Sequence, residues 1–138
     1  MTIVINRVFT RIGDGGTTRL ASGEERRKSD VRVEAYGTVD ELSSVLGLVA
    51  AELGEVRELP VDRADREHTL LDQLHRIQRE LFDLGGELAT SSEAMRPDRP
   101  GISADAVLRL ESEIQATNEH LPTLRSFVLP GGGRLAAS

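Results

Sequence analysis

Residues 70–88 read LLDQLHRIQRELFDLGGEL, and this stretch decides the fold. Its apolar residues follow one another at alternating steps of four and three: Leu70, Leu74, Ile77, Leu81, Leu84 and Leu88. This spacing predicts a helix whose apolar seam packs along a neighbouring helix. Phe82 widens the seam, and the pair Gly85 and Gly86 indicates a tight helix crossing or looser last turns.

Two further helices are predicted on either side of this stretch. The first runs from about Val31 to about Leu53 with Asp30 as its N-cap, although a capping box starting at Thr38 is an alternative beginning. The third opens at Ser103 and ends near Leu121, which precedes a proline. Their apolar stripes are Val39, Leu42, Leu46 and Val49 in the first, and Val107, Leu110, Ile114 and Leu121 in the third. The expected fold class is therefore all-α, a helical bundle.

The remaining segments are predicted to connect or flank these helices. Residues 3–9 form a short β-prone extended arm, residues 54–67 a charged connector, and residues 90–102 a loop rich in serine and proline. Residues 126–133 are an apolar stretch running into glycines, expected to form a compact knot. Residues 134–138 resemble the first turn of a helix that is not completed, so we expect a truncated chain or one that needs partners.

Composition limits the class of protein. The chain has 138 residues, of which 38% are hydrophobic and 29% charged, as in one soluble domain covering residues 1–138. The net charge of −6 argues against a general binder of nucleic acids or membrane surfaces. There is no cysteine, so disulfides and thiolate metal sites are excluded. No early apolar run has the length of a signal peptide or a membrane span, and this favours the cytoplasm. His68, His75 and His120 are scattered, so surface or packing roles are expected for them.

Residues 9–20, FTRIGDGGTTRL, have the composition of a binding loop. Glycines let backbone N–H groups converge on one point, and threonine and arginine side chains add donors suited to phosphate oxygens. The spacing fits neither the Walker A motif nor the dinucleotide-binding glycine motif. A hairpin turn is the alternative interpretation from the residues alone. The basic cluster Arg26-Arg27-Lys28 follows this glycine loop.

Four blocks in the chain resemble the PduO-type ATP:cob(I)alamin adenosyltransferases. They are TRIGDGGTT at 10–18, KSDVRVEAYGTVDEL at 28–42, LFDLG at 81–85 and FVLPGG at 127–132. Small departures from the family pattern are Ile12 in place of the usual threonine, Gly15 in place of a polar residue and Ser43 in place of asparagine. The family's arginine-rich helix and its last helix have no counterpart in this sequence, which matches the expected C-terminal truncation.

The resemblance implies a five-helix bundle, here lacking the last helices, with an extended N-terminal nucleotide-binding arm. It also implies a homotrimer with active sites between subunits. The implied reaction transfers the 5′-deoxyadenosyl group of ATP to cob(I)alamin and gives adenosylcobalamin and triphosphate, with Mg²⁺ on the phosphates. The alternative from another class is a non-catalytic helical module that retains ATP binding or oligomer contacts.

The resemblance also assigns site residues. It implies that ATP is held by Thr10, Arg11, Ile12, Gly13, Thr18 and Lys28. It implies that Asp40 forms a buried ion pair that shapes the cobalamin pocket, and that Phe127 closes the lower face of the corrin ring. From the residues alone, Asp40 would be an ordinary helix carboxylate and Phe127 a core aromatic. No protein ligand to a metal is predicted.

Overall fold

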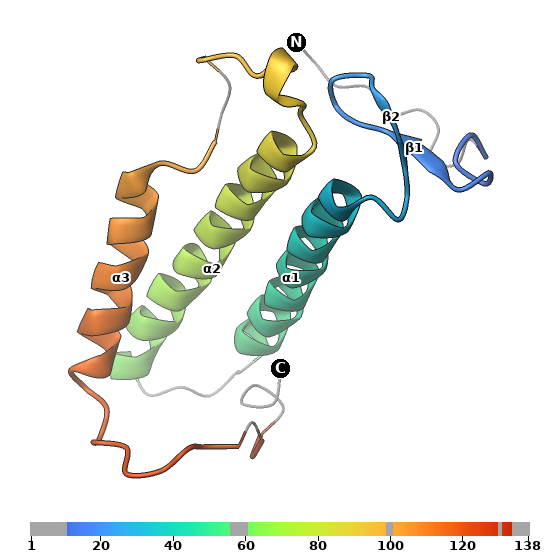
Figure 1. Ribbon diagram of the computed structural model, residues 1–138. Helices are drawn as coiled ribbons and strands as arrows, with labels where there is room; N and C mark the ends of the chain where they lie inside the picture. Colours follow the sequence, from blue (N-terminus) through green and yellow to red (C-terminus); the bar gives the residue numbers. More distant parts are fainter. Residues whose placement is uncertain (1–10, 56–60, 99–100, 130, 134–138) are drawn as a thin grey trace.

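The computed structural model describes residues 11–55, 61–98, 101–129 and 131–133, with side chains omitted at 61–68. Three helices make up most of this part of the chain: α1 (Val31–Gly54), α2 (Val61–Leu88) and α3 (Ala104–Asn118). They lie side by side, with α2 between α1 and α3, and a small β-hairpin lies at the end where α1 begins and α2 finishes (Figure 1). The predicted all-α bundle is confirmed.

Helix α1 begins where the sequence predicted. The Asp30 carboxylate accepts a hydrogen bond from the backbone N–H of Arg32 at 2.9 Å, as an N-cap does. The alternative start at Thr38 is wrong, because the Thr38 hydroxyl donates to the Glu34 carbonyl at 3.0 Å inside the helix. The helix ends at Gly54, one residue beyond the predicted boundary.

Helix α2 contains the predicted apolar seam, which is half-buried from Leu74 to Leu88, but it starts earlier than expected. The prediction that Phe82 widens the seam is wrong, because its side chain is 78% exposed. Residues 61–67 belong to the helix, although the sequence assigned them to a charged connector. Aspartate, arginine, alanine and glutamate are all compatible with a helix, and no glycine or proline interrupts this segment after Pro60. Beyond α2, the predicted loop contains a short 3₁₀ turn, η1 (Ser92–Ala94).

Helix α3 has the predicted cap, since Ser103 Oγ accepts from the Ala106 N–H at 3.1 Å. It ends at Asn118, three residues earlier than expected from Pro122. The N–H groups of His120 and Leu121 donate to carbonyls three residues back, at 3.2 and 3.1 Å, so the chain leaves the α-helix through tighter turns.

The α1–α2 contact includes a close approach at a helical glycine. Gln78 Nε2 donates to the Ser43 carbonyl at 2.9 Å, and a Cβ added at Gly47 would lie 3.2 Å from that nitrogen. Gly47 therefore lies at a point of close packing between α1 and α2. The innermost apolar side chains of the described residues are Leu20, Ala50, Leu53 and Ala106.

Between α2 and α3 the main polar contact is made by Arg76. Its guanidinium binds Glu80 through both carboxylate oxygens, at 2.8 and 2.9 Å, and also pairs with Glu113 of α3. Much of the predicted α3 stripe is nevertheless exposed, including Val107 and Ile114. These side chains are uncovered within the described residues because α3 has a neighbour on one side alone (Figure 1).

The segment after α3 does not form the predicted compact knot. Residues 121–129 have no regular secondary structure, and the Phe127 side chain is fully exposed. The prediction for residues 126–133 is therefore wrong, because no other described segment covers their apolar side chains. The predicted arm at 3–9 and the predicted helical turn at 134–138 lie outside the described residues.

Candidate functional site

The glycine loop leads into a two-stranded antiparallel hairpin. Strand β1 (Thr17–Arg19) pairs with β2 (Glu25–Arg27), with Thr17 opposite Arg27 and Thr18 opposite Arg26. The connecting turn is at residues 20–24, where Gly23 has a φ of 87°. A hairpin is therefore present, but its turn is not the glycine loop.

The glycine loop curls back toward the end of β2. The Asp14 N–H donates to the Arg11 carbonyl and the Gly16 N–H to the Gly13 carbonyl, both at 3.2 Å. Gly16 has a φ of 86°, a left-handed conformation that favours glycine, and its carbonyl accepts from the Lys28 N–H at 2.9 Å. Residues 11–16 thus form a concave loop closed at its base by Lys28.

The side chain of Lys28 lies directly across Gly13. A Cβ built on Gly13 would be 3.2 Å from both Cε and Nζ of Lys28 and 3.1 Å from the Thr17 carbonyl oxygen. A side chain at this position would make Lys28 or the loop backbone shift, so glycine favours this close approach. A lysine ammonium held against a glycine loop is suited to an anion such as a phosphate chain.

The residues predicted to bind the nucleotide lie in different environments. Gly13 and Lys28 are in contact, Thr18 is half-buried, and the Ile12 side chain points into solvent with 77% of its surface exposed. Arg11 has a φ of 60°, which is uncommon for a residue with a side chain and marks a constrained turn. Thr10 lies outside the described residues.

The three members of the basic cluster have different surroundings. Arg26 pairs with Glu24 at 2.6 Å and Asp30 at 3.5 Å, whereas Arg27 is exposed opposite Thr17. Lys28 is the member that meets the glycine loop. Sequence reasoning did not separate these roles, because the alternation of faces depends on the strand register.

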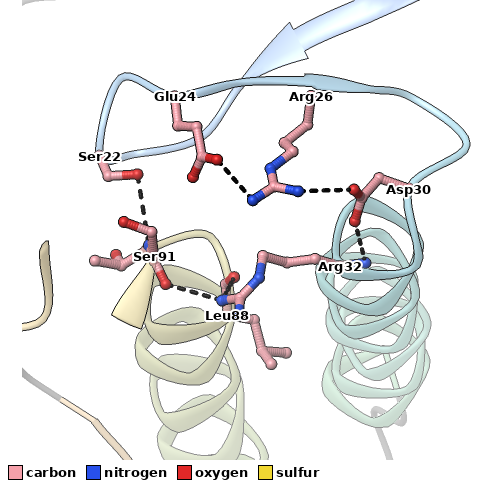
Figure 2. Close-up of polar contacts among 8 residues, drawn as sticks. Ser22, Glu24, Arg26, Asp30, Arg32, Leu88 and Ser91 are labelled. Carbon is pink, nitrogen blue, oxygen red and sulfur yellow. Dashed lines mark hydrogen bonds and ion pairs between the residues drawn. The ribbon is translucent and has the colours of Figure 1, made fainter. Parts of the chain in front are cut away.

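The hairpin is attached to the end of α2 through its turn. The Ala21 N–H donates to the Ala89 carbonyl at 2.8 Å, and Ser22 Oγ accepts from the Ser91 N–H at 3.5 Å. From α1, Arg32 Nη1 donates to the carbonyls of Leu88 at 3.0 Å and Thr90 at 2.9 Å (Figure 2). Thr90 is completely buried, and its hydroxyl donates to the Gly86 carbonyl at 2.7 Å.

Arg32 was not among the predicted site residues. The available signal was its charge, since a cation in the first turn of a helix opposes that helix's own dipole. Its hydrogen bonds to the end of α2 explain why an arginine stands at position 32, because a cation is favourable at the C-terminus of α2.

A groove between α1 and α2 opens below the hairpin. Its volume is about 280 Å³, and its lining includes Tyr36, Gly37, Asp40, Phe82, Gly85 and Gly86. Phe82 is 78% exposed, and Asp40 is also exposed and forms no ion pair with the other described residues. The segment that carries Phe127 lies at the opposite end of the helices from the hairpin (Figure 1). The chain by itself therefore does not bring Phe127 to the glycine loop.

In the described ranges, no three His, Asp or Glu side chains gather as metal ligands, and no helix is long and apolar enough to cross a membrane. His75 and His120 are exposed, in agreement with the expected surface roles. The side chain of His68 is not described.

The sequence matches a described family over nearly its whole length. Residues 8–138 match the family model described as cobalamin adenosyltransferase. The chain is 38% identical over 141 residues to the corrinoid adenosyltransferase of Mycobacterium leprae, covering 99% of this chain and 68% of the relative. It is 39% identical over 132 residues to the corrinoid adenosyltransferase PduO of Citrobacter freundii, covering 94% of this chain and 35% of that protein.

The chain also resembles solved structures of PduO-type ATP:corrinoid adenosyltransferases. A variant PduO-type ATP:corrinoid adenosyltransferase from Lactobacillus reuteri, complexed with cobalamin and ATP, has a TM-score of 0.78 and 31% identity, covering 95% of this chain and 67% of that one. A second variant, complexed with ATP, has a TM-score of 0.76 and 32% identity over 94% and 66% of the two chains. The chain thus spans about one third to two thirds of the length of these relatives.

Proposed function

The chain belongs to the cobalamin adenosyltransferase family, and we propose that it transfers the 5′-deoxyadenosyl group of ATP to cob(I)alamin. Family membership is supported by the match over residues 8–138 and by relatives named corrinoid adenosyltransferases. We propose that residues 1–138 act as one domain and that the reaction takes place in the cytoplasm.

The observation that carries the proposal is the contact between Lys28 and Gly13. The Lys28 ammonium lies against the glycine loop, 3.2 Å from the position of a Cβ built on Gly13. We propose that the triphosphate of ATP binds here, with Arg11, Ile12, Gly13 and Thr18 around it and Thr10 from the preceding segment. Mg²⁺ would be carried on the phosphates and would neutralise part of their charge.

We propose that cobalamin uses the groove that contains Asp40. The corrin ring is large and mainly apolar at its faces, and the exposed ring of Phe82 with the glycine surface of Gly85 and Gly86 offers a flat apolar wall. Phe127 would cover the lower face of the corrin. Because the Phe127 segment and the hairpin lie at opposite ends of one chain, this assignment favours a site completed between copies, as in a homotrimer.

The proposed reaction needs little acid–base chemistry. The cobalt(I) electron pair forms the bond to C5′ of ATP, the bond between C5′ and the phosphate oxygen breaks, and triphosphate leaves with that bond's electrons. No proton has to move in this step. The protein therefore has to orient two substrates and neutralise the leaving triphosphate, the task for which Lys28 is placed.

Product analysis tests the proposed function. The chain is incubated with MgATP and chemically reduced cobalamin, and cobalamin and phosphate products are both quantified. Adenosylcobalamin and triphosphate in equal amounts are expected. Binding of MgATP without either product would instead support the non-catalytic module.

A further inference from the structure

Three successive carbonyls at the end of α2 hold both neighbouring elements. Those of Leu88 and Thr90 accept hydrogen bonds from Arg32 of α1, at 3.0 and 2.9 Å, and that of Ala89 accepts from the Ala21 N–H of the hairpin turn at 2.8 Å. The last carbonyls of a helix have no partner within the helix, so these donors satisfy groups that would otherwise need water.

Burial makes the Arg32 interaction hard to replace by solvent. Thr90 is completely buried and Leu20, at the start of the hairpin turn, is 4% exposed. Without the guanidinium, a carbonyl of a buried residue would lose its donor, and the end of α2 would have to open to hydrate it. Opening there would also release the Ala89 carbonyl that anchors the hairpin.

Arg32 stands between the two parts of the proposed site. The hairpin with Lys28 lies on one side of it, and Asp40 lies eight residues further along α1, about 12 Å at the rise of an α-helix. The backbone hydrogen bonds of Asp14, Gly16 and Lys28, and the approach of Lys28 to Gly13, are made within the hairpin and its flanks. Arg32 takes no part in these contacts, whereas it joins α1 to the end of α2, where the hairpin turn is also attached (Figure 2).

We propose that Arg32 is a positioning residue for adenosyl transfer: it fixes the distance between the nucleotide loop and the α1–α2 groove without contacting either substrate. This inference rests on the proposed function. It goes beyond it by assigning a step-specific role to a residue outside both binding regions. Loss of a positioning residue is expected to slow the transfer step and to leave the ATP affinity nearly unchanged. Misplacement of the reacting groups affects the rate of transfer rather than the binding of ATP.

The experiment compares wild type with Arg32→Met, Arg32→Lys and the control Arg109→Met, which removes an exposed arginine from α3. Arg32→Met is expected to lower kcat by about 10- to 100-fold, the scale of a displacement of about 1 Å, with the Kd for MgATP changed less than about threefold. Arg32→Lys, which keeps the charge and can donate to one carbonyl, is expected to restore part of kcat. Arg109→Met is expected to match wild type.

Amide exchange without substrates provides a second readout that does not require activity. In Arg32→Met the amide of Ala21 is expected to exchange faster than in wild type, while those of Gly16 and Lys28 are unchanged. An Ala21 amide as protected as in wild type, or a kcat equal to that of Arg109→Met, would overturn the inference. Absence of transfer by the wild-type chain would overturn the proposed function instead, and the exchange difference would still decide whether Arg32 anchors the hairpin.

Discussion

At the scale of single residues, the absence of a side chain at Gly13 is as important as the presence of one at Lys28. The ammonium group of Lys28 occupies the space beside the Gly13 backbone, so a positive charge lies directly against the glycine loop. A glycine that merely allowed a turn would not need this free space. Two substitutions separate these possibilities.

Gly13→Ala is expected to weaken MgATP binding by roughly 1–3 kcal/mol, the usual scale of overpacking. The new methyl group would lie 3.1 Å from the Thr17 carbonyl oxygen and 3.2 Å from Lys28 Nζ, so the loop has to widen. Gly15→Ala is the matched control, because a Cβ there meets nothing within 4 Å. Titration calorimetry measures both, and equal affinities for the two variants would contradict the assignment of Gly13.

Lys28→Ala is expected to weaken ATP binding by roughly 1–3 kcal/mol, as for loss of a hydrogen bond to a charged group. Cobalamin binding should hardly change. Arg19→Ala removes the same charge from β1, where the side chain is exposed opposite Glu25. If both variants lost the same affinity, the effect would be general attraction of the nucleotide by a basic hairpin, and Lys28 would have no special contact.

At the scale of elements, the helices could be predicted from the sequence because their signals are local. The Asp30 and Ser103 caps and the seam from Leu70 to Leu88 each depend on residues a few positions apart. The hairpin could not be predicted in this way. Its second strand is Glu-Arg-Arg, which has no apolar alternation, and it is held by pairing with β1 and by attachment to α2.

Two substitutions of Asp30 test its role as the N-cap of α1 separately from its negative charge. Asp30→Ala is expected to lower the free energy of unfolding by about 1 kcal/mol, because the Arg32 N–H loses its acceptor. Asp30→Asn keeps an acceptor of similar capping strength and loses the 3.5 Å pair with Arg26, a partly exposed interaction that contributes little. Urea unfolding followed by circular dichroism compares the two variants. An asparagine variant as unstable as the alanine variant would show that the charge matters more than the cap.

At the scale of the whole molecule, the part of the site that could not be predicted is the part that depends on distant segments. The loop residues Gly13 and Lys28 are brought together by local turns. The composition of the glycine loop indicated a binding loop, and the family resemblance added Lys28 to it. The surroundings of Asp40 and Phe127 depend on elements far apart in the chain. Asp40 has no ionic partner among the described residues, and Phe127 is uncovered. Local sequence patterns carry no information about such distances.

Phe127→Ala is expected to reduce adenosyl transfer strongly while leaving ATP affinity unchanged, because the ring is proposed to act on cobalamin. Leu129→Ala is the control, since Leu129 is an exposed apolar residue of the same segment. The absorbance change of cobalamin under reducing conditions reports the rate. Equal rates for both variants would show that the segment contributes general apolar surface and that the aromatic ring has no specific role.

The most direct test of the nucleotide site is amide hydrogen exchange with and without MgATP in the 138-residue chain. The glycine loop has few apolar contacts of its own, so its amides should exchange readily in the free protein. We predict that MgATP slows exchange across residues 11–18 and at Lys28, and leaves α3 unchanged. If residues 11–28 exchange equally fast in the presence and absence of saturating MgATP, the loop is structural and the proposed nucleotide site is wrong.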